Sequence, residues 1–234
     1  MLTGITTATS GDCIIFGHRI SDDMTAVRQI TGICPQQNVL FPQLTVKEHL
    51  YFFGKLKGLY GITLHDAVTA ITRDVGLTEK LNVASDALSG GMKRKLCLAN
   101  ALVGNPKFVL LDEPTSGMDP YSRRATWELL QRHKAGRVIV LTTHFMDEAD
   151  ILGDRIAIMS EGRLQCSGTS LFLKNKYGAG YVLTMAKSDS KVPSASIVNF
   201  VKNLIPSACL SSAVAGEVCA TTPALHWFKI PSLN

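Results

Sequence analysis

The sequence predicts an α/β fold built around a mostly parallel sheet. Between residues 108 and 159, short apolar runs alternate with segments of helical spacing, which is typical of parallel strands joined by right-handed crossovers. The run at 108–111 is continuously apolar, as expected for a strand buried on both faces of a parallel sheet. Two carboxylates, Asp112 and Glu113, follow it directly, at the strand end where open parallel sheets bind their ligands.

The other elements follow from the spacing of apolar residues. Apolar residues at steps of three and four predict helices, and short apolar runs between turn residues predict strands. Thr45 and Ser89 stand where they can cap helices, and Pro120 stands at the first position of one. The predicted helices cover 46–56, 64–75, 90–103, 120–134, 146–152, 170–177 and 196–204; the predicted strands cover 13–16, 30–34, 138–142, 155–159 and 181–185. The rest of 1–30 is interpreted as short strands and turns, and 208–218 as an apolar stretch without a clear period.

Length, composition and charge exclude several classes of protein. A chain of 234 residues with 46% hydrophobic and 18% charged residues can bury a core in one large domain, or in one domain and part of a second. The net charge of +5 is spread along the chain, so no basic stripe indicates a nucleic-acid partner. The six cysteines form no Cys-x-x-Cys pair, which argues against a metal cluster. We expect neither a signal peptide nor a membrane span, because no apolar run reaches about 18 residues.

The acidic pair after the apolar run is suited to a complex of magnesium and nucleotide. Because neighbouring side chains of a strand point to opposite faces, Asp112 can hold the magnesium shell while Glu113 faces an attacking water. A buried carboxylate near phosphate needs a cation, which magnesium would supply. The alternative is a pair that only caps the following turn. The residues Pro-Thr-Ser-Gly-Met-Asp-Pro at 114–120 favour the nucleotide site.

A second candidate phosphate site lies at Leu-Ser-Gly-Gly-Met, residues 88–92. Ser89 opens a helix, and the free N–H groups and partial positive charge of a helix start attract phosphate. Gly90 and Gly91 let the backbone approach a ligand closely. The alternative is an ordinary capped helix. The basic residues 93–95 are also candidates for phosphate contacts, although the helical pattern places them mainly on the solvated side.

Together these segments resemble the ATP-binding cassette of ABC transporters, and in particular the A subfamily of lipid exporters. The resemblance is carried by 88–92, by Leu-Leu-Asp-Glu-Pro-Thr-Ser-Gly-Met-Asp-Pro at 110–120 and by Thr-Thr-His-Phe-Met-Asp-Glu-Ala-Asp at 142–150, and it extends from residue 1 to about residue 181. It implies a partial P-loop NTPase fold with a helical subdomain beside the sheet. It also implies ATP and Mg²⁺ as cofactors.

The resemblance implies roles for the residues at the strand ends. Glu113 would polarise the hydrolytic water, and His144 would contact the terminal phosphate. Asp112 would bind magnesium. Gln36 would contact magnesium or water and report to the membrane domain, unless it is an ordinary loop amide, and Gln37 beside it is the lesser candidate.

The resemblance further implies contacts with a second cassette. Cassettes of this family work as head-to-tail pairs, so Ser89, Gly90 and Gly91 would bind a nucleotide held by the partner. Asp119 would communicate between the two cassettes, or cap the helix that starts at Pro120, and both roles are compatible.

One expected motif does not occur in the 234 residues. They contain no Gly-x-x-x-x-Gly-Lys-Ser/Thr loop, the Walker A motif that would cradle the nucleotide's phosphates. In the resembled family, the residues Met-Leu-Thr-Gly found at 1–4 come just after the helix that follows that loop, so we expect a cassette truncated at its N-terminus. Without the lysine and the backbone cradle, the polypeptide alone should bind ATP weakly and hydrolyse it negligibly.

Two regions are predicted, a nucleotide-binding domain at 1–186 and the start of a small α+β regulatory domain, or a divergent tail, at 187–234. The parent protein would couple ATP binding and hydrolysis to transmembrane transport, with a lipid as the implied substrate. Its partners would be a second cassette and the transmembrane domains of the same transporter, which places the chain at the cytoplasmic face of a membrane. A groove for the membrane domain is expected near the aromatic residues 51–53. The alternatives are a catalytically silent binding module and a soluble ABC ATPase.

Overall fold

The computed structural model describes residues 1–178, 181–186, 193–206, 208–214 and 217–222. The chain forms two compact units, Met1–Leu152 and Gly153–Asn234. The predicted domain boundary after residue 186 stays a prediction, because this division reflects contacts within the chain and not function. Each unit is described by itself.

A three-stranded parallel sheet lies at the centre of the first unit. Its strands are β3 (Thr31–Cys34), β4 (Phe108–Asp112) and β5 (Val138–Thr142), with β4 in the middle. Cys34 pairs with Leu111, and Asp112 pairs with Thr142. The carboxyl ends of all three strands therefore meet at one edge, as the α/β prediction requires.

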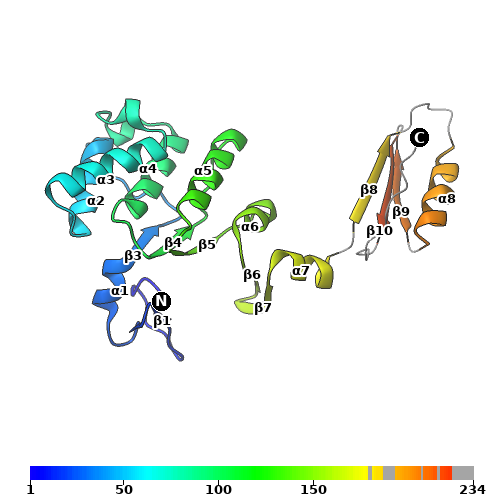
Figure 1. The fold of residues 1–234 in the computed structure, drawn as a ribbon, viewed down its shortest axis with the longest axis horizontal. Helices are drawn as coiled ribbons and strands as arrows, with labels where there is room; N and C mark the ends of the chain where they lie inside the picture. The colour runs from blue at the N-terminus through cyan, green and yellow to red at the C-terminus, as the bar shows by residue number, and fades with distance from the viewer. Residues whose placement is uncertain (179–180, 187–192, 207, 215–216, 223–234) are drawn as a thin grey trace. The chain divides into compact units, whose positions relative to one another are not determined.

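Three helices from the segment between β3 and β4 pack together on one side of this sheet, where α4 (Gly90–Leu102) contacts β3 and β4. They are α2 (Val46–Leu56), α3 (Gly61–Asp74) and α4, and Figure 1 shows them together on one side of the strands. Leu50, Leu96 and Leu98 lie fully buried in the core between these helices and β4. Thr45 and Glu48 form a capping box at the start of α2, where each side chain bonds the other residue's backbone N–H. The predicted bounds of α2 are therefore confirmed by its cap and its apolar face.

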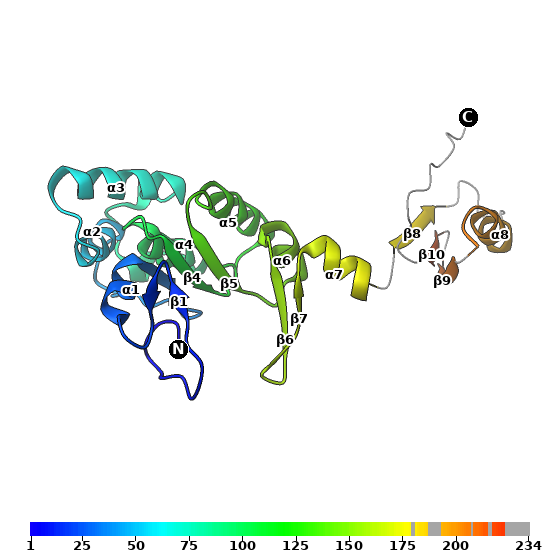
Figure 2. The same ribbon diagram turned by 60° about the horizontal axis from the view of Figure 1, so that its bottom comes forward.

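The opposite face of the sheet contacts a small layer near the N-terminus. The strands β1 (Ile14–Ile15) and β2 (His18–Arg19) pair antiparallel, and α1 (Met24–Ile30) follows them. Ile15, Val27 and Phe108 form its buried core. The helix α1 was not predicted, because its seven residues bury only Val27 and so show no helical period. Figure 2 shows α1 and β1 on the side of the sheet away from α3.

The first unit is completed by two helices and two short 3₁₀ turns. The helix α5 (Pro120–Arg132) follows β4, and α6 (Met146–Leu152) follows β5 and packs against α5. The 3₁₀ turns Thr78–Lys80 and Ser85–Ala87 connect α3 to α4. Within the described residues, no helix is long and apolar enough to cross a membrane.

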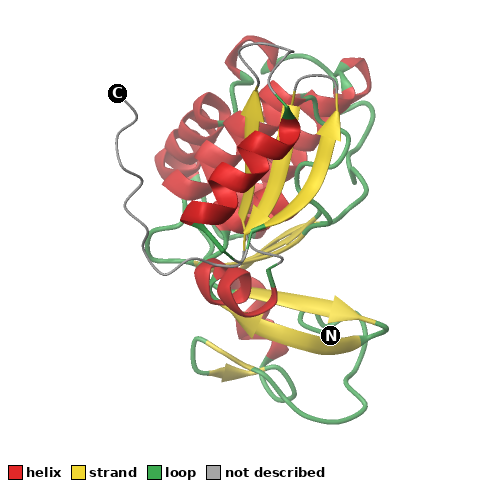
Figure 3. Cartoon of the chain, turned by 90° about the vertical axis from the view of Figure 1, so that its right-hand side faces the viewer, coloured by secondary structure: helices red, strands yellow, loops and turns green. Residues whose placement is uncertain are grey.

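The second unit contains a hairpin, a helix and a small sheet. The hairpin strands β6 (Ile156–Ser160) and β7 (Arg163–Gly168) pair antiparallel, and α7 (Ser170–Tyr177) follows. The strands β8 (Tyr181–Ala186), β9 (Cys209–Val214) and β10 (Glu217–Thr222) form an antiparallel sheet in the order β8-β10-β9. The helix α8 (Ser194–Leu204) packs on this sheet (Figure 3). Its Val201 forms a buried cluster with Ala208 and Ala220.

Two expectations change in this unit. The alternating pattern predicted that residues 155–159 continue the parallel sheet, but β6 pairs antiparallel with β7 in a separate sheet. The apolar stretch 208–218 is not irregular, because it holds β9 and the start of β10. Within the region predicted at 187–234, residues 223–234 lie outside the described residues.

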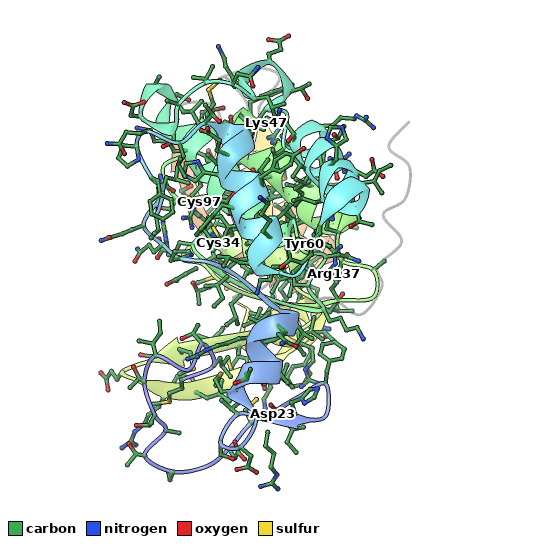
Figure 4. All side chains as sticks on the ribbon, turned by 90° about the vertical axis from the view of Figure 1, so that its left-hand side faces the viewer. Asp23, Cys34, Lys47, Tyr60, Cys97 and Arg137 are labelled. Carbon is green, nitrogen blue, oxygen red and sulfur yellow. The ribbon has the colours of Figure 1, made fainter. Side chains whose placement is uncertain are left out.

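Two buried cysteines should make the first unit less stable at alkaline pH. Burial raises the pKa of the Cys34 thiol to about 12 and that of Cys97 to about 11, from an ordinary value of 9.0. Figure 4 shows both residues beside α2. In the unfolded chain these thiols ionise near their ordinary pKa, whereas in the folded chain they stay protonated to higher pH. The free energy of unfolding should therefore fall as pH rises from about 9 towards 11.

Urea unfolding at several pH values between about 8 and 10.5 measures this loss. In a Cys34→Ala/Cys97→Ala variant, the free energy of unfolding should fall less steeply with pH. The other titrating groups contribute the same slope to both proteins. A matched Cys13→Ala/Cys166→Ala variant, which removes less buried thiols, should keep the original slope. Equal slopes for all three proteins would contradict the prediction.

Candidate active site

The edge where the parallel strands end carries the acidic pair. Asp112 is the last residue of β4, and its Oδ1 accepts a hydrogen bond from the Thr142 hydroxyl on β5. Its side chain is exposed, which corrects the expectation of a buried carboxylate. The residue is exposed although the strand before it is buried, because it is the last residue of β4 and lies at the edge of the sheet. In the described part of the chain, hydrogen bonds reach only Oδ1 of this carboxylate.

Glu113 lies just beyond the strand in a strained backbone conformation. Its φ is +46°, a left-handed value that is costly for a residue with a side chain. The Glu113 N–H donates to Thr142, to the backbone oxygen at 3.1 Å and the hydroxyl at 3.2 Å, which fixes this conformation. We expected the side chains of Asp112 and Glu113 to be separated by the alternation of a strand. They are instead separated by the backbone turn at Glu113. Strain of this kind is concentrated at functional sites.

His144 lies directly beside Glu113. The Nδ1 atom of His144 is 3.4 Å from Glu113 Oε1, and the two side chains are 57% and 25% exposed. The His144 ring packs on Phe145, and the Arg123 guanidinium of α5 lies 3.9 Å from the centre of the Phe145 ring. The structure thus brings together the two residues that the sequence assigned to water and terminal phosphate.

Gln36 lies at the same edge of the sheet, in the loop after β3. Its side chain is exposed, and its backbone oxygen accepts a hydrogen bond from Arg94 Nη1 at 3.0 Å. The neighbouring Gln37 is also exposed. Both fit the alternative of a solvated loop amide as well as a metal or water ligand, so the role of Gln36 stays a prediction.

The Leu-Ser-Gly-Gly-Met run begins α4. Ser89 is the N-cap, and its hydroxyl accepts from the Met92 N–H at 3.3 Å. Ser89 and Gly90 are exposed and Gly91 is half-buried. A Cβ added at Gly90 or Gly91 would meet no atom within 4 Å, and neither glycine has a left-handed φ. The fold itself therefore does not require glycine at either position.

Asp119 is the N-cap of α5. Its Oδ1 accepts from the backbone N–H groups of Tyr121 and Ser122, both at 3.0 Å. Hydrogen bonds from Ser122, first from its side chain and then from its backbone, lower the pKa of Asp119. The capping role is confirmed by this geometry. Communication with a second cassette stays a prediction.

Arg94 is the functional candidate that the sequence pattern missed. We expected residues 93–95 mainly on a solvated side, but Arg94 is only 2% exposed. Its spacing to Cys97, Leu98 and Ala101, all buried on α4, could have revealed this, because those residues share one helical face with it. The positive residues Lys93 and Lys95 on either side hid the signal.

A second buried network joins the segment after the acidic pair to α6. Glu148 is fully buried, and its Oε1 accepts from the Thr115 hydroxyl at 2.9 Å and from Trp127 Nε1 at 3.0 Å. Thr115 follows the acidic pair by two residues, and Glu148 follows His144 by four. Glu148 therefore fixes the segments that carry Glu113 and His144 to each other and to α5.

Comparisons with known proteins show the family to which the chain belongs. The family described as ABC transporter matches residues 1–116. The human phospholipid-transporting ATPase ABCA3 is 52% identical over 223 residues, which is 95% of this chain and 13% of that protein. The chain belongs to the A subfamily of the ATP-binding cassette family. Rat ATP-binding cassette sub-family A member 17 is 48% identical over 223 residues, 95% of this chain and 12% of its own length.

A solved cassette has the same fold. The structure titled ATP binding subunit of ABC transporter superposes with a TM-score of 0.69 and 28% identity, and the match covers 76% of this chain and 74% of that one. This cassette spans about one eighth of the length of its curated relatives. Nucleotide binding is the property shared across the family.

The residues at the strand edge fit a magnesium–nucleotide complex better than a metal bound by protein alone. Among the described residues, no group of three or more His, Cys, Asp or Glu side chains is arranged to hold a metal ion. Mg²⁺ in nucleotide sites is bound by one or two protein oxygens and otherwise by phosphates and water. Asp112 is exposed, and its Oδ2 accepts no hydrogen bond in the described part of the chain, so it could supply one such oxygen.

Proposed function

We propose that this cassette is the nucleotide-driven part of a lipid transporter, in which ATP binding and hydrolysis move phospholipid across a membrane. The observation that carries the proposal is the 3.4 Å approach of His144 to Glu113, on a strained backbone at the end of two parallel strands. The lipid substrate is supported by the relatives, which are described as phospholipid-transporting ATPases. Transport itself needs the transmembrane domains of the parent protein.

In the proposed reaction each residue at the edge has one task. Asp112, with Gln36, would bind Mg²⁺, which neutralises charge on the phosphates when bound. Glu113 would accept a hydrogen bond from the attacking water and orient it. His144, held beside Glu113 and against Phe145, would donate to the terminal phosphate. Loss of any one of these groups should affect turnover more than nucleotide binding.

The start of α4 supports a second, intact cassette as partner. Glycine in a helix is less favourable than alanine by about 1 kcal/mol, and here the fold gains nothing from it in return. A ligand that must approach the backbone closely explains two glycines at an exposed helix start. We therefore place the partner's bound ATP against Ser89, Gly90 and Gly91, in a head-to-tail pair at the cytoplasmic face of the membrane.

The test mixes the 234-residue chain with an intact cassette of the same subfamily and follows association by analytical ultracentrifugation. We expect association that requires ATP and Mg²⁺. A Gly91→Asp variant should lose it, because a carboxylate beside the bound phosphates is repelled. The same variant should be at least as stable as the parent, since an acidic first turn and the loss of a helical glycine both stabilise α4.

The matched control is Ile62→Asp, which adds the same charge at the second position of α3, where the side chain is 76% exposed. This variant should associate like the parent chain. Undiminished ATP-dependent association of Gly91→Asp would show that α4 does not face the phosphates. Association without ATP would contradict a nucleotide-bridged pair.

A surface for the membrane domain is proposed beside α2. Phe41 and Phe52 are both exposed, and their rings meet edge to face with centres 5.7 Å apart. The Phe41 N–H donates to His49 Nε2, which fixes the loop after Gln36 against α2. This exposed aromatic pair replaces the expected groove around residues 51–53 as the proposed contact, because Tyr51 and Phe53 pack partly against the core.

A further inference from the structure

We propose that Arg94 is a positioning residue that holds the loop of Gln36 against the acidic end of β4. This inference rests on the proposed function, because it concerns the spacing between the two groups assigned to magnesium. Arg94 lies on α4, on the helical turn after Ser89–Gly91. It touches neither nucleotide nor metal, and acts through the backbone of the residues that do.

Every N–H of the Arg94 guanidinium donates to a backbone carbonyl. Nε donates at 3.0 Å, Nη1 at 2.5 and 3.0 Å, and Nη2 at 2.5 and 2.8 Å. The five acceptors are the oxygens of Pro35, Gln36, Asp112, Glu113 and Pro114. Two of them belong to the loop after β3 and three to the segment that ends β4. One planar group thus joins two segments that are more than seventy residues apart in sequence.

Packing alone does not explain an arginine at this position. Burying a cation is costly unless its hydrogen bonds are all made, and an apolar side chain would fill the same space more cheaply. In the described structure no carboxylate lies within ion-pair distance of Arg94. Its charge is balanced by carbonyl dipoles alone, and these belong to the segments that carry Gln36, Asp112 and Glu113. Arg94 therefore sets where these three residues lie relative to each other.

Lysine cannot replace arginine in this role. The guanidinium presents five donors in a rigid fork, whereas an ammonium presents three donors from a single atom. Lysine at position 94 keeps the charge but reaches only one of the two segments at a time. Arg94→Lys therefore separates the effect of the fork from the effect of the charge.

The test uses the full 234-residue chain with Mn²⁺–ATP at millimolar concentration as a paramagnetic probe, because paramagnetic broadening reports even weak binding. In the parent chain, Mn²⁺ bound at Asp112 should broaden the amide NMR signals of Gln36 and Glu113 together. In Arg94→Lys the signals near Asp112 should still broaden, while the broadening of Gln36 falls several-fold because its loop has moved away. Lys93→Met, which removes a neighbouring half-buried charge but leaves the fork, should behave like the parent.

A measurement on the parent chain keeps the inference testable if Arg94→Lys does not fold. The Arg94 Nε–H signal should exchange slowly with water and remain visible at alkaline pH, unlike that of the exposed Arg124. Rapid exchange of the Arg94 signal would overturn the inference, as would unchanged broadening of Gln36 in a folded Arg94→Lys. Mn²⁺ that binds far from Asp112 in the parent chain would instead overturn the metal role in the proposed function.

Discussion

Glu113→Gln is expected to lower ATP turnover by about 10²–10⁴-fold while nucleotide binding is retained. The amide keeps the size of the side chain and the strained backbone at Glu113, but it cannot take a proton from water. The loss should therefore appear in kcat, with little change in KM. Its partner His144 should remain in place, because its ring packs on Phe145, which in turn contacts Arg123.

The measurement needs a phosphate-binding loop, so residues 1–178 of this chain are placed in the human relative, where they replace its homologous segment. ATP hydrolysis is measured in this chimera with and without the substitution. Glu128→Gln is the matched control, because Glu128 is an exposed carboxylate on α5. Turnover of Glu113→Gln within a few-fold of the parent would remove Glu113 from the reaction.

Glu148→Ala is expected to lower the free energy of unfolding by about 3 kcal/mol. The substitution leaves the hydroxyl of Thr115 and the indole N–H of Trp127 buried without an acceptor, and each unpaired donor costs about 1–3 kcal/mol. It also opens a cavity between α5 and α6. Glu148→Gln, which keeps an acceptor oxygen, should lose less.

Urea unfolding followed by circular dichroism measures both variants. Glu128→Ala serves as the exposed control and should change stability by less than about 0.5 kcal/mol. If Glu148→Ala were as stable as Glu128→Ala, the buried network would contribute nothing to the fold. In that case Glu148 could not be what holds the Glu113 and His144 segments together.

The elements with a strong period and a cap were predictable from sequence. The helix at 46–56 and the strand at 138–142 have the predicted bounds, since caps and apolar runs act locally. The parallel sheet was predictable because β4 is apolar on both faces. The partner of β6 was not, because a five-residue strand has the same pattern whether its neighbour is parallel or antiparallel.

In the candidate site, the approach of Glu113 and His144 was predictable, but the local geometry was not. Sequence spacing placed Glu113 and His144 at the ends of adjacent strands, and the structure brings them together. The exposure of Asp112 and the left-handed turn at Glu113 depend on Thr142, a residue of another strand. Such contacts are set by tertiary structure and leave no local signal.

Arg94 shows most clearly what local patterns miss. An arginine between two lysines suggests a charged surface, yet its acceptors come from segments near residues 35 and 113. Only the packing of α4 against β3 and β4 brings those carbonyls within reach. The apolar spacing that it shares with Cys97 and Leu98 was a weak hint of this.

The open surroundings of Gly91 have a consequence for inherited variants. If the proposed function holds, a parent protein altered there would fold normally but would no longer complete the nucleotide site of its partner cassette. A change at Glu148 would instead lead to misfolding and degradation. Small molecules that stabilise the folded cassette should therefore restore a Glu148 variant, and should have no effect on a Gly91 variant.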